Sequence, residues 1–156
     1  MEIILSEKEK LFMEIAKKVV ENWREVMNID PIWELPIDIY DEDDAPPSAK
    51  GALDVSEAQY YRAPVLLFEG MFDLSEEEFM AELNDKVVPH ELTHLVAVDF
   101  FRTATLMARD NDQLREELRY KYEQFVVRFC KIITTLRNEN LRLRYELKKS
   151  SAGPEE

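Results

Sequence analysis

One pattern in the sequence could do chemistry, an H-E-x-x-H motif at residues 90–94. His90 and His94 are four residues apart, so on a helix both imidazoles point to one side and can reach one metal ion. Glu91 can take a proton from a water on that ion. No other histidine occurs in the chain. The motif predicts a zinc site with Glu91 as general base, although a helix with two accidental histidines has the same spacing.

The helix expected to carry this motif begins after Ser75, which can form a capping box with Glu78. Its apolar residues and both histidines share a stripe that we expect to face inward: Phe79, Leu83, Val87, His90, His94, Val98 and Phe101. Pro89 interrupts the pattern because proline cannot donate a helical hydrogen bond. The helix therefore either kinks, or ends near residues 84–85 and restarts with Pro89 in its first turn.

A third ligand must be a carboxylate, because a catalytic zinc usually has three protein ligands and no histidine is left. The candidates on the last helix are Glu116, Glu117, Glu123 and Glu139. A turn near residues 108–111 should send this helix back antiparallel, which brings the low-to-mid 120s level with His94. Glu123 fits this length and borders the apolar face. We expect His90, His94 and Glu123 to bind Zn²⁺, with Glu117 as the alternative third ligand.

The last helix is expected to follow a turn at residues 110–112 and to pack one apolar stripe on the core. That stripe consists of Leu114, Leu118, Tyr122, Phe125, Phe129, Ile132, Ile133 and Leu136. Cys130 lies beside it and is expected to pack as a small hydrophobic residue. Beyond Arg137 the pattern weakens, which indicates a frayed or partner-binding extension. We expect a single domain over residues 1–149 and a disordered tail over 150–156.

The first half of the chain predicts one helix and a small sheet. Ser6 and Glu9 can form a capping box before a run of apolar residues at helical spacing. Extended segments are expected at residues 32–35, 37–40, 51–55 and 64–69, with a mobile acidic loop at 41–48. The fold class is therefore α+β: a compact domain with an N-terminal helix, about three strands, the motif helix and a long C-terminal helix that carries the glutamate.

Composition excludes several classes of function. The 156 residues carry a net charge of −13, which argues against binding to nucleic acid or to an anionic membrane. There is no apolar run near 18 residues and no secretory signal pattern. The single cysteine cannot form an internal disulfide. These features favour a cytoplasmic protein.

With these elements in place, the chain resembles a zincin metallopeptidase of the gluzincin branch, such as minigluzincins and the IrrE/ImmA-like and phage-type metallopeptidases. The resemblance rests on the complete motif at 90–94, on the order of elements over residues 6–136 and, weakly, on residues 123–130. It implies that a peptide lies extended along the strand ending near Phe68. Two features depart from the family. One is Pro89, and the other is the lack of a histidine to stabilise the oxyanion, which leaves as candidates Tyr60, Tyr61, Tyr120 and Tyr122.

The leading hypothesis is a zinc-dependent metallopeptidase that hydrolyses peptide bonds in peptides or proteins, with the oligomeric state left open. The alternative is a zincin-like binding or assembly module with a metal site and little or no catalysis. Pro89 and the charged extension after Arg137 favour that alternative. A third hypothesis is a purely structural helical protein without a metal.

Overall fold

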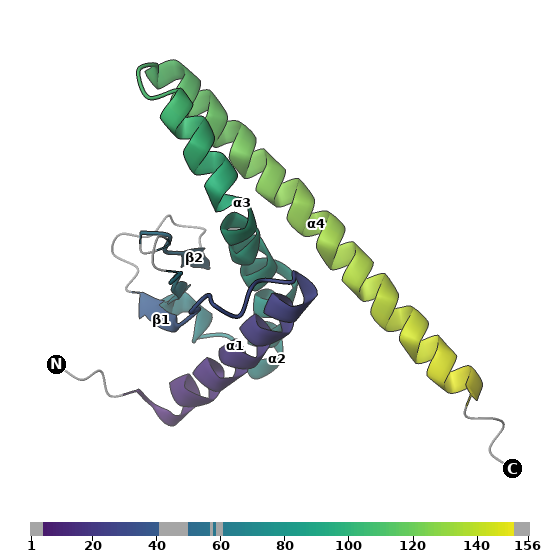
Figure 1. The fold of residues 1–156 in the computed structure, drawn as a ribbon. Helices are drawn as coiled ribbons and strands as arrows, with labels where there is room; N and C mark the ends of the chain where they lie inside the picture. Colours follow the sequence, from purple (N-terminus) through teal and green to yellow (C-terminus); the bar gives the residue numbers. More distant parts are fainter. Residues whose placement is uncertain (1–4, 41–49, 57, 59–60, 152–156) are drawn as a thin grey trace, which may run out of the picture.

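The structure is a computed structural model that describes residues 5–40, 50–56, 58 and 61–151. Its elements in chain order are α1 (Glu7–Val26), β1 (Ile37–Tyr40), β2 (Gly51–Leu53), β3 (Val65–Phe68), the 3₁₀ turn η3 (Glu69–Met71), α2 (Glu76–Glu82), the π-helical turn η4 (Leu83–Val87), α3 (Val88–Met107) and α4 (Asp112–Ser151). The α+β class, the N-terminal helix, the three strands and the long C-terminal helix are as predicted (Figure 1). The expected loop at 41–48 lies outside the described residues.

The core lies where α1 packs against α2 and the start of α3. Both predicted capping boxes are present, Ser6 with Glu9 and Ser75 with Glu78, so α1 and α2 begin where the sequence indicates. The buried ring of Phe12 stacks on that of Phe79 with centroids 4.1 Å apart. This aromatic contact joins α1 to the helix that leads into the motif.

The sheet has the order β1-β3-β2, with β3 parallel to β1 and antiparallel to β2. The expected strand at 32–35 is wrong, because Pro36 follows it and it makes only an isolated bridge, between Glu34 and Arg62. The expectation that a peptide adds to the strand ending near Phe68 is also wrong. β3 is the central strand, so both of its edges are already paired.

β2 comes unusually close to the motif helix because it contains Gly51. A Cβ at this position would lie 2.7 Å from Val87 Cγ1 and 2.9 Å from the carbonyl oxygen of Leu66. Neither neighbour leaves room for a side chain. Glycine therefore permits the approach that places β2 beside the start of α3.

The π-helical turn η4 shows how the helix accommodates Pro89. α2, η4 and α3 follow one another without a gap, and Pro89 lies in the first turn of α3. Val88 donates its N–H to Leu83 O in the wider π pattern. The next π acceptor is the carbonyl of Asn84, whose partner would be the missing N–H of Pro89. The indole Nε1–H of Trp23 donates to that carbonyl instead, at 2.9 Å.

The π turn also changes which residues of α3 face the core. A π turn inserts one extra residue, which rotates everything after it by about 100° relative to an uninterrupted helix. The core stripe accordingly continues through Val88, Leu92 and Leu95, all buried. The expectation that the histidines share the inward stripe is therefore wrong: His90 and His94 are half-buried on its flank.

α4 runs antiparallel to α3 after a turn at residues 108–111, as expected, and it extends past the body of the molecule (Figure 1). It is helical through Ser151, and the rest of the expected tail, residues 152–156, lies outside the described residues. None of the described helices combines the length and apolarity needed to cross a membrane.

The expected core face of α4 is wrong. Val126 and Cys130 are buried, whereas Phe125, Ile132 and Leu136 are exposed. The helix is rotated so that a different face meets α3, and this rotation points Tyr122 and Glu123 toward His94. Cys130 packs as a small buried residue, in agreement with the sequence.

Candidate metal centre

Three side chains from two helices meet where α3 passes α4. His90 and His94 lie in the first two turns of α3, and Glu123 faces them from α4. The structure therefore brings together the three residues expected to bind zinc. Glu117, the alternative third ligand, is exposed and lies outside this cluster.

Two of the donor spacings are close to those of a tetrahedral zinc site. With bonds of about 2.0–2.1 Å, adjacent donors in a tetrahedral site lie about 3.3–3.4 Å apart. His90 Nε2 and His94 Nε2 are 3.2 Å apart, and His94 Nε2 is 3.7 Å from Glu123 Oε2. All three ligand atoms lie within 4.8 Å of one another. Two imidazole nitrogens and one carboxylate oxygen are donor types that bind Zn²⁺, and they lie close to one another here.

Both imidazoles have a lowered pKa, which favours the neutral form over the protonated form. Burial, together with the neighbouring His90, lowers the pKa of His94 to about 4. Burial also lowers the pKa of His90, while the Glu123 carboxylate opposes that shift. Neutral imidazole is the form that binds a metal, and both rings are neutral at pH 7.

Glu91 is the only charged side chain among the buried residues of the described chain, at 8% exposure. Burial and, to a lesser extent, the Glu123 carboxylate raise its pKa to about 8, against the opposing effect of a hydrogen bond from the backbone of Leu53 in β2. A carboxyl group held in this way is typical of functional sites, because a stable fold gains nothing from burying it.

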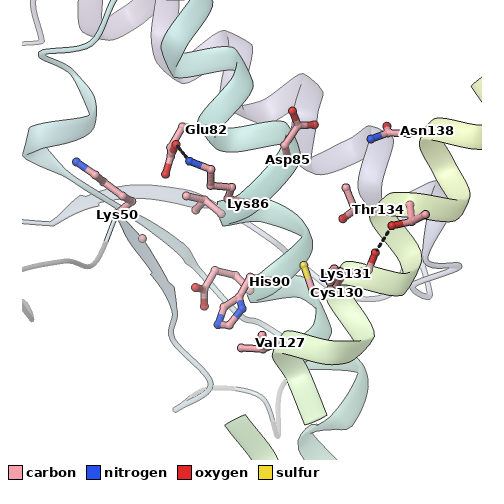
Figure 2. Close-up of a pocket in the computed structure, with 14 residues that line it drawn as sticks. Lys50, Glu82, Asp85, Lys86, His90, Val127, Cys130, Lys131, Thr134 and Asn138 are labelled. Carbon is pink, nitrogen blue, oxygen red and sulfur yellow. Dashed lines mark hydrogen bonds and ion pairs between the residues drawn. The ribbon is translucent and has the colours of Figure 1, made fainter. Parts of the chain in front are cut away.

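A cleft of about 570 Å³ opens beside these residues. One wall consists of η4 and the start of α3, with Lys86, His90 and Glu91, and Lys50 and Gly51 line the cleft from the β2 side. Figure 2 shows Val127, Cys130 and Thr134 on α4 facing His90 across the cleft. His90 therefore opens onto a cavity of the size that binds a small ligand or a peptide segment.

Tyr122 joins α3 and α4, the two helices that carry the candidate ligands. Its hydroxyl donates to the carbonyl oxygen of His94 at 3.0 Å, and its ring stacks on Phe101 with centroids 4.2 Å apart. Because Glu123 is the next residue along α4, this contact holds its backbone beside His94. The sequence offered Tyr122 only as a candidate oxyanion stabiliser, and a phenol bound to a helix carbonyl cannot take that part without breaking this bond.

Two neighbours of Glu91 were not foreseen from the sequence. The Leu53 backbone reaches it only because β2 approaches α3, which is a tertiary effect with no local signal. Cys130 lines the cleft, and burial raises the pKa of its thiol, so it remains neutral. The one hint of this position in the sequence is that Cys130 lies beside the expected apolar face of the last helix.

Comparison with known proteins identifies no relative. No protein-family model matches the chain, no curated protein is significantly similar to it, and no solved structure matches it. The resemblance of residues 6–136 to gluzincins therefore stays a prediction. Support for a function comes from the geometry of the site itself.

Proposed function

We propose that the protein is a zinc-dependent metallopeptidase in which His90, His94 and Glu123 hold the metal and Glu91 is the general base. The observation that carries the proposal is the convergence of the three donor atoms, within 4.8 Å, from helices joined by a turn. Glu91 and His90 line the same cleft, which gives a substrate access to both. Zinc held there would polarise a water molecule and the carbonyl of the scissile peptide bond.

Glu91 takes the proton of the attacking water and passes it to the leaving amine. It must be ionised for the first of these transfers. Without a cation its pKa of about 8 reflects burial and the Glu123 carboxylate. A divalent ion beside Glu123 would offset that carboxylate and favour the ionised form of Glu91 at neutral pH.

The peptide would lie along β2 rather than along β3. In the described part of the sheet, β2 is an edge strand, paired on one side only, with β3. A hydrogen bond joins the Leu53 backbone to Glu91, so the open edge runs past the general base. An extended peptide can add to such an edge through main-chain hydrogen bonds.

One observation favours the binding-module alternative: Tyr122, a candidate to stabilise the oxyanion, already uses its hydroxyl in a hydrogen bond. Tyr122 donates to His94 O, and the exposed Tyr61 packs edge-on against Trp33 with ring centroids 5.5 Å apart. Tyr60 lies outside the described residues. Zinc at one ion per chain without cleavage that depends on Glu91 would select this alternative.

Metal analysis of protein purified without a histidine tag tests the proposal. We expect one zinc ion per chain in the wild type and none in a His90→Ala/His94→Ala variant. Structural zinc sites bind with about 10–16 kcal/mol shared among four ligands, so two lost ligands remove about 6 kcal/mol, or roughly 10⁴-fold in affinity. Wild-type protein without zinc, or zinc retained in the double variant, would overturn the proposal.

Cleavage of casein separates the peptidase from the binding module. Glu91→Gln is expected to retain zinc and to lose about 10²–10⁴-fold in the rate of cleavage, the usual contribution of a general base. Glu117→Gln is the matched control, because Glu117 lies on α4 outside the cluster, and it should retain both zinc and activity. Undiminished cleavage by Glu91→Gln would remove Glu91 from the mechanism.

A further inference from the structure

Three lysines line the cleft beside the candidate metal centre. They belong to three separate segments, because Lys50 directly precedes β2, Lys86 lies in η4 and Lys131 lies in α4 (Figure 2). The whole chain holds only ten lysines among its 156 residues and carries a net charge of −13. A group of lysines on this cleft therefore departs from the acidic character of the rest of the chain.

Two of these lysines are available to bind an anion. Lys50 and Lys131 are exposed, and neither forms an ion pair within the part of the chain that the structure describes. Lys86 Nζ is paired with Glu82 Oε2 at 2.6 Å, and the side chain of Lys86 is 70% exposed. An ammonium group has three donors, so Lys86 can also bind a second carboxylate.

The positive charges on the lining exceed the carboxylates that could neutralise them. The acidic residues of the lining are Glu82, Asp85 and Glu91. Glu82 is paired with Lys86, and in the proposed peptidase Glu91 acts on the water bound to the metal ion. Asp85 therefore remains as the single carboxylate against Lys50 and Lys131, which leaves an excess of positive charge on the cleft.

Lys86 and Lys131 lie level with each other on the two helical walls. α3 and α4 run antiparallel, and His94 Nε2 lies 3.7 Å from Glu123 Oε2. Lys86 is eight residues before His94. Lys131 is eight residues after Glu123, so both lysines lie about 12 Å along the helices from that contact. His90 is about 6 Å from their level. Since an extended peptide rises about 3.3 Å per residue, the lysines face a substrate residue about two or three positions from the scissile bond.

We propose that Lys50, Lys86 and Lys131 form a subsite that binds a carboxylate of the substrate peptide, on an aspartate or glutamate side chain or at its C-terminus. The inference rests on the proposed peptidase function and adds the substrate class to it. Hydrogen bonds between ammonium and carboxylate groups are stronger than neutral ones. Lysine is a point charge on a flexible stem, so lysines on separate walls can approach one carboxylate without a fixed geometry.

Cleavage of matched peptides tests the subsite. Decapeptides with blocked ends carry one glutamate that is moved along an otherwise uncharged sequence, and each has a counterpart with glutamine at the same position. We expect kcat/KM of the wild type to be about tenfold higher with glutamate at one favoured position, because two or three exposed ion pairs together have an effect of this size. A further pair without glutamate, with a free or an amidated C-terminus, tests the terminal carboxylate in the same way.

Replacement of the two unpaired lysines separates the subsite from the catalytic groups. Lys50→Gln/Lys131→Gln is expected to retain zinc, to cleave the uncharged peptides as the wild type does, and to keep less than about a twofold preference for the carboxylate. Lys148→Gln is the matched control, because Lys148 is an exposed lysine of α4 outside the cleft, and it should keep the full preference. A wild type without any preference, or a double variant that keeps it, would overturn the inference.

Binding without cleavage distinguishes failure of the subsite from failure of the peptidase. Fluorescently labelled glutamate and glutamine peptides are titrated with the wild type and the double variant in the presence of a chelator, and binding is followed by anisotropy. Tighter binding of the glutamate peptide that is lost in the double variant supports the subsite even if no peptide is ever cleaved. Equal affinities for the two peptides would overturn the subsite, and cleavage dependent on Glu91 would then still support the peptidase.

Discussion

The two sides of α4 differ in composition and in what they contact. The side toward α3 and the cleft carries Tyr122, Glu123 and Cys130, and it packs on the motif helix. The other side carries a more regular apolar strip, most of which is exposed: Leu114, Leu118, Phe125, Phe129, Ile132, Leu136, Leu143 and Leu147. Burial therefore follows the face that packs against His94, rather than the longest apolar pattern.

The largest expected effect concerns Glu91, a buried residue of α3 that lines the cleft. Its pKa is about 8 in the folded protein against an ordinary value of 4.5, so the folded state keeps a proton that the unfolded chain releases. A pKa raised by folding contributes stability that is present below pH 4.5 and is lost as the pH rises through about 8. In metal-free protein, wild type should therefore weaken relative to Glu91→Gln over this window.

Urea unfolding in the presence of a chelator measures this effect. The two proteins should have similar free energies of unfolding near pH 4, and Glu91→Gln should be more stable by a few kcal/mol at pH 9, at about 1.4 kcal/mol per pKa unit. Glu139→Gln changes an exposed residue on α4 and serves as the control. A stability difference that does not vary with pH would show that Glu91 is not a buried, protonated group.

A smaller effect compares the two sides of α4 directly. Val126 is fully buried against α3, and its replacement by alanine should lower the free energy of unfolding by about 2 kcal/mol, from lost burial and the cavity left behind. Ile132→Ala on the strip should change it by less than about 0.5 kcal/mol. A larger loss for Ile132→Ala would place the strip in the core of the monomer.

The features that could be predicted from the sequence are those determined by local interactions. Ser6 and Ser75 begin their helices through caps made within four residues, and Glu123 could be placed from the length of an antiparallel hairpin. The rotation of α4 could not be predicted, because its apolar strip is a better local core pattern than the face around Val126. The face that packs is determined by contacts with residues distant in the chain, such as Tyr122 with His94, 28 positions away.

The π turn could not be predicted from the sequence for a related reason. Pro89 signals a disturbed helix, but a break, a kink and a π turn all accommodate a missing amide proton. The outcome depends on Trp23, which donates to the Asn84 carbonyl from 61 residues away. Both histidines consequently lie on the flank of the expected core stripe, and His90 opens onto the cleft.

The smallest expected effect concerns the hydrogen bond that the hydroxyl of Tyr122 donates to the carbonyl oxygen of His94. The experiment asks whether this bond determines the rotation of α4. Tyr122→Phe keeps the ring on Phe101 and removes only this bond, which should lower the free energy of unfolding by about 1 kcal/mol. It should also weaken zinc binding severalfold, because Glu123 is then held less firmly beside the histidines. Tyr120→Phe removes an exposed hydroxyl two residues away and should change neither quantity. Equal behaviour of the two variants in unfolding and in zinc titration would mean that packing alone, through Val126 and Phe101, determines which side of α4 faces the metal site.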